Sequence, residues 1–353
     1  MKKTVYLQLL LALIIVLPAK SQNDSIDSYS VNDTLADFGL FTRDDILELS
    51  LRFDVTQYKR KKPKDEYLDA VLTYHISKTD SINKNIRLKS RGQFRNGYCD
   101  FPPIALNFKK TEFKMGDLNK LEKMKLVTHC QSGNEEIVFK EYLIYKLYNV
   151  LSDSSFRVRL LRINYINTFK QSKPIRSYAF FIEPLDLLAE RTNSVPVEVL
   201  TLSQKNIVPE MMDRMAIFNY MIGNTDWSVP GQHNCKVLAS LRTDRSDLGM
   251  IVPYDFDYSG LVNATYAVPA EGLGIESVRQ RIYLGTCRSE EVYLNALKEF
   301  ANKKESFYKV IREFPYLDER TKKDMIRYLD EFYSGFDKKT SIVYNLLNQC
   351  KNF

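Results

Sequence analysis

Gly223–Asn234 reads GNTDWSVPGQHN, and a second polar stretch, Pro253–Gly260, reads PYDFDYSG. The first stretch follows an apolar run with helical spacing, so Gly223 and Asn224 predict the end of a helix. Asn, Asp and Gly are also common in turns for purely conformational reasons. An ordinary turn does not require an Asp, a His and an Asn in one loop with two more carboxylates close behind. The ordered set therefore predicts a site.

Two short strand patterns, Asn234–Ala239 and Gly249–Pro253, lie between these polar stretches. If they pair as a hairpin, Asn234 and Asp255 come close together, with Asp226 at the same end. Mg²⁺ accepts few carboxylates and keeps waters or phosphate oxygens, so such a cluster suits Mg²⁺ with bound phosphates. An Asp held beside the metal can orient an acceptor hydroxyl and take its proton.

The order of secondary structure indicates the fold class. Strand patterns dominate the first half of the chain and helical patterns dominate from Leu185 onward. This order predicts an α+β fold of two lobes, a strand-rich N-lobe over 41–184 and a helical C-lobe over 185–353. The expected strands of the first half are Asp69–Ile76, Asn85–Ser90, Ile104–Lys109, Lys123–Thr128, Phe156–Ile166 and Arg176–Glu183. The expected helices are Glu136–Leu151, Leu185–Arg191, Pro209–Ile222, Ser289–Lys303, and stretches within Asp318–Tyr333 and Asp337–Gln349.

The Glu136–Leu151 helix has an apolar stripe that also contains Glu141. An inward carboxylate is costly unless a cation pairs with it and hydrogen bonds satisfy it. The positions three and four residues further on hold Ile144 and Tyr145, so a cation would have to come from another element. The preceding strand offers Lys125. The alternative is that Glu141 lies at the edge of the stripe and reaches solvent.

The segment FNYMIGNTDWSVPGQHNCKVL, followed by IVPYDFDYSG, resembles the catalytic segment of the atypical protein-kinase-like families. It is most similar to the CotH-type spore-coat kinases and the HipA-type kinases. In those families a helix ends in a Gly-Asn-x-Asp turn, an Asn helps to bind metal, and a hairpin leads to a metal-binding Asp. The resemblance implies a two-lobed, protein-kinase-like fold with Asp226 as the catalytic residue. It also implies that Asn234 and Asp255 bind metal, with Asp257 as a candidate second ligand.

The resemblance extends towards the N-terminus with less specific motifs. RLKSRGQFR (Arg87–Arg95) resembles the R-G loop that opens the CotH-type domain, which implies that Arg91 contacts the nucleotide. EEIVFKEYLIYKLYNVL resembles the helix of the first lobe, which contains Glu141. YAFFIEPLDLLAER resembles the strand and hinge between the lobes, which places Glu183 near the adenine.

The chain also departs from these families. Asp226 and Asn234 are eight positions apart, further than in related kinases, so Val229–Gly231 is interpreted as an insertion. The CotH-type families have a lysine shortly after the R-G loop, where this chain has CDFPP (Cys99–Pro103). Lys125 is our substitute for that lysine, because it suits an inward Glu141.

These observations predict an exported atypical kinase that uses ATP with Mg²⁺ or Mn²⁺. It would transfer phosphate to a hydroxyl-bearing acceptor, which could be a protein, a peptide, a glycan or a lipid. One alternative is nucleotidyl transfer on the same metal and phosphate site. Another alternative is a non-catalytic envelope protein that keeps the fold to bind a partner, which the unassigned lysine favours.

The N-terminal segment MKKTVYLQLLLALIIVLPAKSQ has the pattern of a secretory signal. It has a basic start, an apolar run and small residues before a cleavage point after Ser21, so residues 1–21 are assigned to the signal peptide. The apolar run is shorter than the roughly 20 residues of a membrane span. We therefore expect no stable span after cleavage, with an uncleaved anchor as the alternative. Residues 22–40 are expected to form a flexible leader, and the protein to lie in the periplasm or at the cell surface.

Charge argues against a nucleic-acid partner. The whole chain carries +7, and removal of Lys2, Lys3 and Lys20 with the signal leaves +4. So small a charge on a chain of this length does not indicate nucleic-acid binding. One dense basic run, Lys59–Lys62 with Lys64, is interpreted as a solvated loop, with a patch for anions or lipid headgroups as the alternative.

Cysteine is sparse, with five residues and no CxxC spacing, so neither a zinc ribbon nor a disulfide scaffold is indicated. One or two disulfides are possible in an oxidising compartment, but their pairing cannot be read from the sequence. A zinc set built from His129-Cys130 and His233 with Cys235 is disfavoured.

Overall fold

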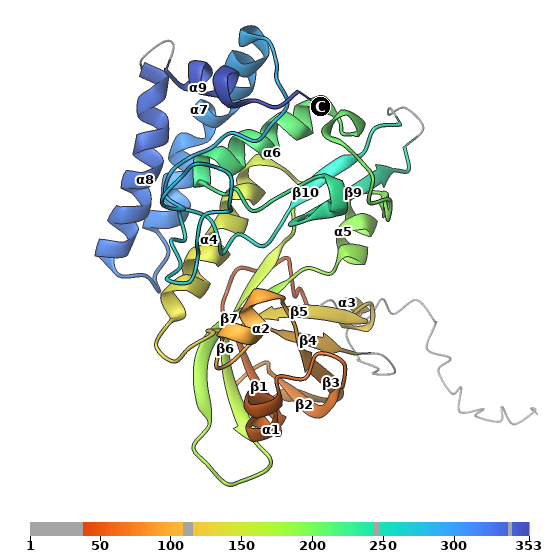
Figure 1. Cartoon of the computed structure of the whole chain (residues 1–353). Helices are drawn as coiled ribbons and strands as arrows, with labels where there is room; N and C mark the ends of the chain where they lie inside the picture. Colours follow the sequence, from red (N-terminus) through yellow and green to blue (C-terminus); the bar gives the residue numbers. More distant parts are fainter. Residues whose placement is uncertain (1–37, 109–115, 243–246, 338–340, 353) are drawn as a thin grey trace, which may run out of the picture.

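The chain folds into a β-barrel and a mainly helical part that packs against one end of it (Figure 1). The structure is a computed structural model that describes residues 38–108, 116–242, 247–337 and 341–352. Strands come first in the chain and helices later, so the expected mixed α+β class is confirmed. The assigned signal peptide, residues 1–21, and the leader up to residue 37 lie outside the described residues.

Seven strands close the barrel in the order β1-β2-β3-β4-β5-β7-β6. All neighbours are antiparallel except β6 and β1, whose parallel pairing closes the ring with Leu47 opposite Leu161. In β1 every second residue is buried, because successive side chains of a strand point to opposite faces. The strands are β1 (Leu47–Phe53), β2 (Leu68–His75), β3 (Ser81–Ser90), β4 (Ile104–Asn107), β5 (Lys123–Val127), β6 (Val158–Asn167) and β7 (Ile175–Ile182).

Three short helices lie in the connections between the barrel strands: α1 (Val55–Lys61), α2 (Phe94–Tyr98) and α3 (Gly116–Asn119). Helix α1 contains most of the basic run that the sequence had suggested to be a loop. Its start is capped by the Asp54 carboxylate, which accepts the N–H of Gln57 at 2.7 Å. Its last turn carries three cations, Lys59, Arg60 and Lys61, which the negative end of the helix dipole favours.

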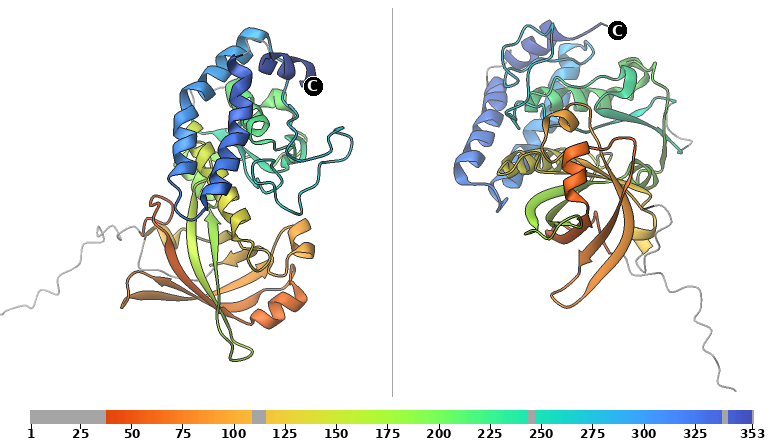
Figure 2. Two further views of the ribbon diagram at one scale, coloured as in Figure 1. Left: turned by 90° about the vertical axis from the view of Figure 1, so that its left-hand side faces the viewer. Right: turned by 60° about the horizontal axis from the view of Figure 1, so that its bottom comes forward.

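Helix α4 (Glu135–Leu151) runs between the barrel and the other helices, and side chains around its whole circumference are buried. Helix α7 runs to Arg312, beyond the expected end at Lys303, and packs against α4 and α8. Both views of Figure 2 keep the barrel on one side and the long helices on the other. The remaining elements are α5 (Leu185–Arg191), β8 (Ser194–Pro196), α6 (Pro209–Ile222), β9 (Cys235–Ser240), β10 (Met250–Pro253), α7 (Glu290–Arg312), α8 (Glu319–Asp337) and α9 (Ser341–Gln349).

The packed fold reaches back to the last residues of the expected leader. Leu40 is buried in the barrel core. Asp44 and Asp45, which the sequence left without a role, form ion pairs with Lys146 at 2.7 Å and Arg159 at 3.1 Å. None of the described helices is long and apolar enough to cross a membrane.

Two disulfides link positions whose pairing the sequence did not reveal. Cys99 at the end of α2 is bonded to Cys130, just before α4, and Cys287 is bonded to Cys350 near the C-terminus. Cys235 is a buried free thiol. Because Cys130 is committed to a disulfide, it cannot serve the disfavoured zinc set.

Candidate functional site

Helix α6 and the loop after it form one wall of the candidate site. The helix begins with Pro209 and ends at Gly223, which has a left-handed φ of 68°. A Cβ on Gly223 would lie 2.1 Å from the hydroxyl of Tyr328, so no larger residue fits here. The carbonyl of Gly223 accepts the N–H of Gly260 at 3.0 Å. This bond holds the two polar stretches side by side.

A chain of amide side chains fixes the loop that carries Asp226. Asn224 is buried, and its side chain donates to the Asn219 side chain at 2.9 Å. The Asn224 side-chain oxygen accepts the backbone N–H of Asp226 at 3.1 Å. Asp226 is therefore held by bonds that reach back into helix α6.

The Asp226 carboxylate is shared by two neighbours from the far side of its loop. The amide nitrogen of Asn234 donates to Asp226 Oδ2 at 2.8 Å and to the Asp226 carbonyl at 2.7 Å. Asp226 Oδ1 lies 2.8 Å from Nε2 of His233. The expected proximity of Asp226 and Asn234 is confirmed, and the side chain of Asp226 stays partly exposed.

The expected hairpin is also confirmed. Strands β9 and β10 pair antiparallel, with Pro253 opposite Cys235, and the N–H of Tyr254 donates to the Asn234 carbonyl at 3.0 Å. Asp255 follows directly, and its N–H donates to the hydroxyl of Tyr145 in α4 at 2.9 Å. Asp255 and Asn234 both have positive φ, 63° and 50°. Strained backbone of this kind clusters at functional sites.

Glu141 faces inward, as one of the two readings expected, and it is fully buried. Its partner is Arg95 of helix α2, 3.2 Å away, and the expected pairing with Lys125 is wrong. Arg95 also lies 3.7 Å from Asp257, whose carboxylate accepts the hydroxyl of Tyr266 at 2.8 Å. The disulfide from Cys99 holds helix α2 against the start of α4, which explains why Arg95 reaches this place.

Electrostatics in this buried cluster are unbalanced, because one guanidinium faces several carboxylates. Burial raises the pKa of Asp257 to about 6, and the charge of Asp255 adds to the shift while Arg95 opposes it. Burial likewise raises the pKa of Glu141 against the opposing charge of Arg95. Asp257 is thus engaged by Arg95 and Tyr266. In the described part of the chain, the Asp255 carboxylate has no hydrogen-bonding or ion-pair partner.

A cavity of about 500 Å³ lies beside this cluster, between the barrel wall and the β9–β10 hairpin. The amine of Lys125 stands 4.3 Å from the ring centre of Tyr254, and that of Lys236 stands 5.9 Å from the same ring. Burial lowers the pKa of Lys125 to about 8; the charges of Arg91 and Lys236 add to the decrease, and Asp255 opposes it. The cavity is lined by Arg91, Ala105, Lys120, Glu122, Lys123, Met124, Lys125, Phe156, Ile182, Glu183, Pro184, Leu185, Asp186, Lys236 and Tyr254.

Besides Lys125, two more of the expected cofactor residues line this cavity, and they differ in their freedom to bind a ligand. The Nε atom of Arg91 is buried and has no hydrogen-bond partner among the described residues. The carboxylate of Glu183, in contrast, accepts two bonds from Arg191, at 3.1 and 2.8 Å, and the N–H of Arg157 at 3.0 Å. Glu183 therefore fixes the end of β7, and Arg91 remains available to a ligand.

The sequence reasoning left four residues of this region without a role: Arg95, Tyr145, Lys236 and His233. His233 and Arg95 lie inside stretches quoted for the site. Their position in the sequence next to predicted site residues could therefore have identified them. Tyr145 and Lys236 lie on regular elements, and only the tertiary structure brings them to the site.

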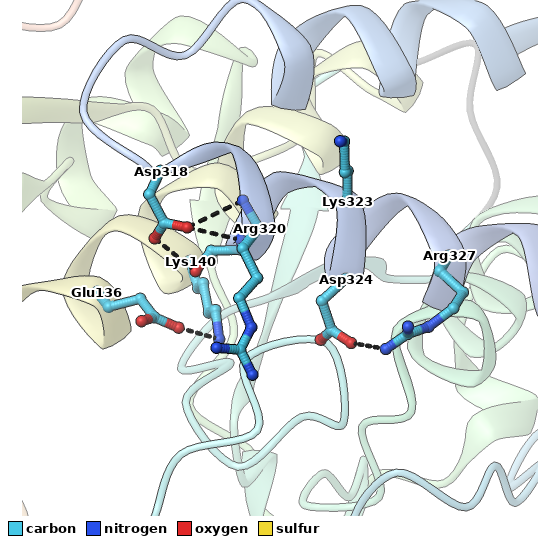
Figure 3. Close-up of a pocket in the computed structure, with 8 residues that line it drawn as sticks. Glu136, Lys140, Asp318, Arg320, Lys323, Asp324 and Arg327 are labelled. Carbon is cyan, nitrogen blue, oxygen red and sulfur yellow. Dashed lines mark hydrogen bonds and ion pairs between the residues drawn. The ribbon is translucent and has the colours of Figure 1, made fainter.

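A larger cavity of about 880 Å³ lies elsewhere, between α4 and α8. Figure 3 shows that two pairs of its charged side chains contact each other, Glu136 with Lys140 and Asp324 with Arg327. Lys140 contacts Glu136 at 2.5 Å, and Asp318 accepts the hydroxyl of Thr321 at 2.8 Å at the start of α8. Its size alone does not make it a functional site, and it contains none of the residues expected from the sequence.

Comparison with solved structures finds similarity to a kinase, whereas comparison with sequences finds none. No protein-family model and no curated protein sequence matches this chain. The chain is similar to the Helicobacter pylori proinflammatory kinase CtkA, at 14% identity and a TM-score of 0.38. The match covers 70% of this chain and 90% of that one. This TM-score is too low to decide a fold.

The buried Arg95 cluster leads to a stability prediction. Replacing Arg95 with Met should lower the free energy of unfolding by about 2 kcal/mol at neutral pH, because it leaves Glu141 and Asp257 without their cation. Chemical denaturation followed by the fluorescence of Trp227 measures the change. The matched control is Arg162→Met, which breaks an exposed ion pair with Glu48 and should cost at most about 1 kcal/mol. Equal effects of the two substitutions would show that the buried cluster does not support the fold.

Proposed function

We propose that this protein binds a nucleoside triphosphate in the Lys125–Tyr254 cavity and transfers its terminal phosphoryl group to a hydroxyl-bearing acceptor. One observation carries the proposal. A cavity has Arg91, Lys125 and Lys236 on its walls, and Asp255 directly follows its lining residue Tyr254. The Tyr254 N–H bonds Asn234, which in turn holds Asp226, so these oxygen-bearing residues lie at the same end of the hairpin. Cations on one side and oxygen donors on the other are what a metal-bound polyphosphate requires.

The donor set fits Mg²⁺ or Mn²⁺ in the presence of phosphates. Among the described residues, no three His, Cys, Asp or Glu side chains come together as a metal cage. Mg²⁺ needs no such cage when phosphates and waters complete its shell. Asp255 offers a carboxylate. The amide nitrogen of Asn234 donates to Asp226, so the amide oxygen of Asn234 can bind the metal. The bound metal would neutralise charge on the phosphates as the phosphoryl group leaves.

Each residue of the chain then has a defined task. Lys125, Arg91 and Lys236 hold the phosphates by charge, and Tyr254 provides an aromatic surface in the same cavity. Asp226 orients the acceptor hydroxyl and accepts its proton, since its carboxylate is partly exposed and fixed by Asn234. The overall arrangement, a barrel joined to a helical part with the site between them, is consistent with a two-lobed, kinase-like fold.

Two disulfides support the proposal that the protein is exported to the periplasm or the cell surface. Disulfides persist in oxidising compartments and are rare where thiols are kept reduced. Four of the five cysteines are paired here, and the fifth, Cys235, is buried. The signal-like N-terminus suggests the same location.

A second candidate function is nucleotide binding without transfer, as a non-catalytic binding protein. The favouring observation is that Glu141 pairs with Arg95, which leaves Lys125 without the carboxylate that would hold it over the phosphates. Nucleotidyl transfer on the same site is the third outcome, and labelling ATP at the α- or the γ-phosphate distinguishes it.

Nucleotide binding is the first test of the proposal. ATP with Mg²⁺ or Mn²⁺ should raise the melting temperature of the mature protein and change the fluorescence of Trp227. Trp227 is the single tryptophan of the chain and follows Asp226 directly, so it reports on the site. Lys125→Met should weaken ATP binding, while Lys298→Met, an exposed lysine of α7, should not. Absence of any response to ATP with either metal would overturn the proposed function.

The pKa of Lys125 gives a pH dependence. Phosphate binding favours the charged amine, so ATP affinity should be steady below pH 8 and fall as the amine loses its proton above it. Between pH 7 and pH 9 we expect a decrease of about tenfold, measured by titration of the Trp227 signal. Lys125→Met should remove this dependence. A pH profile that is the same in wild type and variant would show that Lys125 does not contact the phosphates.

A further inference from the structure

The far end of the barrel, opposite the helical part, carries a surface that the proposed function does not use. Helix α1 and the β6–β7 loop lie side by side there (Figures 1 and 2). Asn167 joins them, because its side chain accepts the N–H of Val55 at 3.1 Å and donates to the hydroxyl of Thr56 at 2.9 Å. The N–H of Thr168 also donates to the Phe53 carbonyl at 2.9 Å. The two segments therefore present one fixed surface, which we call the basal surface.

The basal surface contains a cavity of about 420 Å³ with cations from both segments. Lys59 and Arg60 come from α1, and Lys170 and Lys173 come from the β6–β7 loop. No Asp or Glu lines the cavity, and none of these four cations has an ion-pair partner in the described part of the chain. The acidic residues nearby in the sequence do not line the cavity with these cations. Asp54 caps α1, and Asp65 and Glu66 lie in the loop that follows the helix.

One aromatic residue of the barrel core also lines the cavity. Tyr165 is almost fully buried, and its hydroxyl has no hydrogen-bond partner among the described residues. Four cations with no carboxylate among the lining residues define the ligand as an anion with several oxygens, such as a phosphate group.

Phe169 distinguishes between possible sources of that phosphate. It lies in the β6–β7 loop directly before Lys170, and 69% of it is exposed, more than any other large apolar residue that the structure describes. A free phosphate ion gains nothing from an exposed aromatic ring. A lipid bilayer does, because aromatic side chains are favoured at the level of the headgroups while lysines bind the phosphates.

We propose that the basal surface docks on a membrane that contains anionic phospholipids. Phosphate headgroups enter the cavity of Lys59, Arg60, Lys170 and Lys173, and Phe169 inserts among the headgroups. A protein docked in this way keeps the proposed nucleotide cavity away from the membrane, because that cavity lies between the barrel wall and the β9–β10 hairpin. The proposal does not depend on the proposed function, because it concerns a different end of the barrel.

Co-sedimentation with vesicles tests it, using the mature chain from residue 22 on, which keeps every described residue. The protein should bind vesicles of phosphatidylcholine with phosphatidylglycerol and not vesicles of phosphatidylcholine alone. Lys170→Gln/Lys173→Gln should weaken binding about thirtyfold, since each cation near an anionic surface contributes roughly fivefold. Phe169→Ser should weaken it about tenfold. High salt should abolish it.

The matched control is Lys298→Gln/Lys303→Gln, which removes two exposed lysines from α7 and should leave vesicle binding unchanged. Circular dichroism melting confirms that each variant is folded, and the Trp227 response to ATP should be the same in all of them. Equal loss in the control pair would overturn the proposal, because it would indicate non-specific charge attraction. Binding of inorganic phosphate that equals vesicle binding, with no effect of Phe169→Ser, would identify a soluble-anion site instead. Stronger binding to a DNA oligonucleotide than to vesicles would also overturn it.

Discussion

Asp226→Ala should retain the affinity for ATP and metal and lose phosphoryl transfer by about a hundredfold or more, the usual contribution of a positioned base. The carboxylate is partly exposed and held by Asn234 and His233, and it is not among the side chains that line the nucleotide cavity. Under the proposed function, it acts on the acceptor and not on the nucleotide. The assay uses γ-labelled ATP with the mature protein and follows both self-labelling and labelling of a periplasmic extract.

The control for this substitution is Asp226→Asn, which keeps the size of the side chain but cannot accept a proton as a carboxylate does. It should be as inactive as Asp226→Ala and should melt closer to wild type. If Asp226→Ala loses nucleotide affinity, Asp226 belongs to the metal shell. If the wild-type protein binds ATP but labels nothing with any divalent metal, the result favours the alternative of a non-catalytic binding protein. Labelling from α-labelled ATP alone would identify nucleotidyl transfer.

Asp255→Asn should abolish the stabilisation that Mg²⁺ or Mn²⁺ gives in the presence of ATP, and leave the melting temperature of the free protein nearly unchanged. In the described part of the chain its carboxylate has no protein partner, so removal of the charge breaks no internal contact. Asn also tolerates the left-handed conformation of this position, where φ is 63°. Thermal shift with ATP, with each metal and with both together measures the effect.

Asp257→Asn provides the contrast, because Asp257 is buried against Arg95 and Tyr266. This substitution should change the stability of the free protein and keep its metal dependence. If Asp255→Asn instead destabilises the free protein strongly while metal-dependent nucleotide binding survives, Asp255 is a structural turn residue. The pair of isosteric variants thus separates a metal ligand from a structural carboxylate two residues away.

The sequence predicted the local parts of the site better than its long-range contacts. The end of α6 at Gly223 and the hairpin that joins Asn234 to Asp255 were predictable, because turn residues and short strands act over a few positions. The strict alternation of β1 was also readable, although it was not assigned. The partner of Glu141 was not predictable: Arg95 lies on a five-residue helix, too short to show a period. Its position depends on a disulfide whose pairing the sequence cannot give.

The parallel pairing of β1 with β6 has a consequence for how the chain folds. Strand β2 can join β1 as soon as a short stretch of chain is available, but the opposite edge of β1 must wait for residues 161–167. Contacts between distant parts of a chain form slowly, because loop-closure entropy opposes them. Until then β1 exposes an unpaired edge, where another chain can add a strand. If the protein is exported as proposed and emerges unfolded from its N-terminus, closure of the barrel is the step most exposed to aggregation.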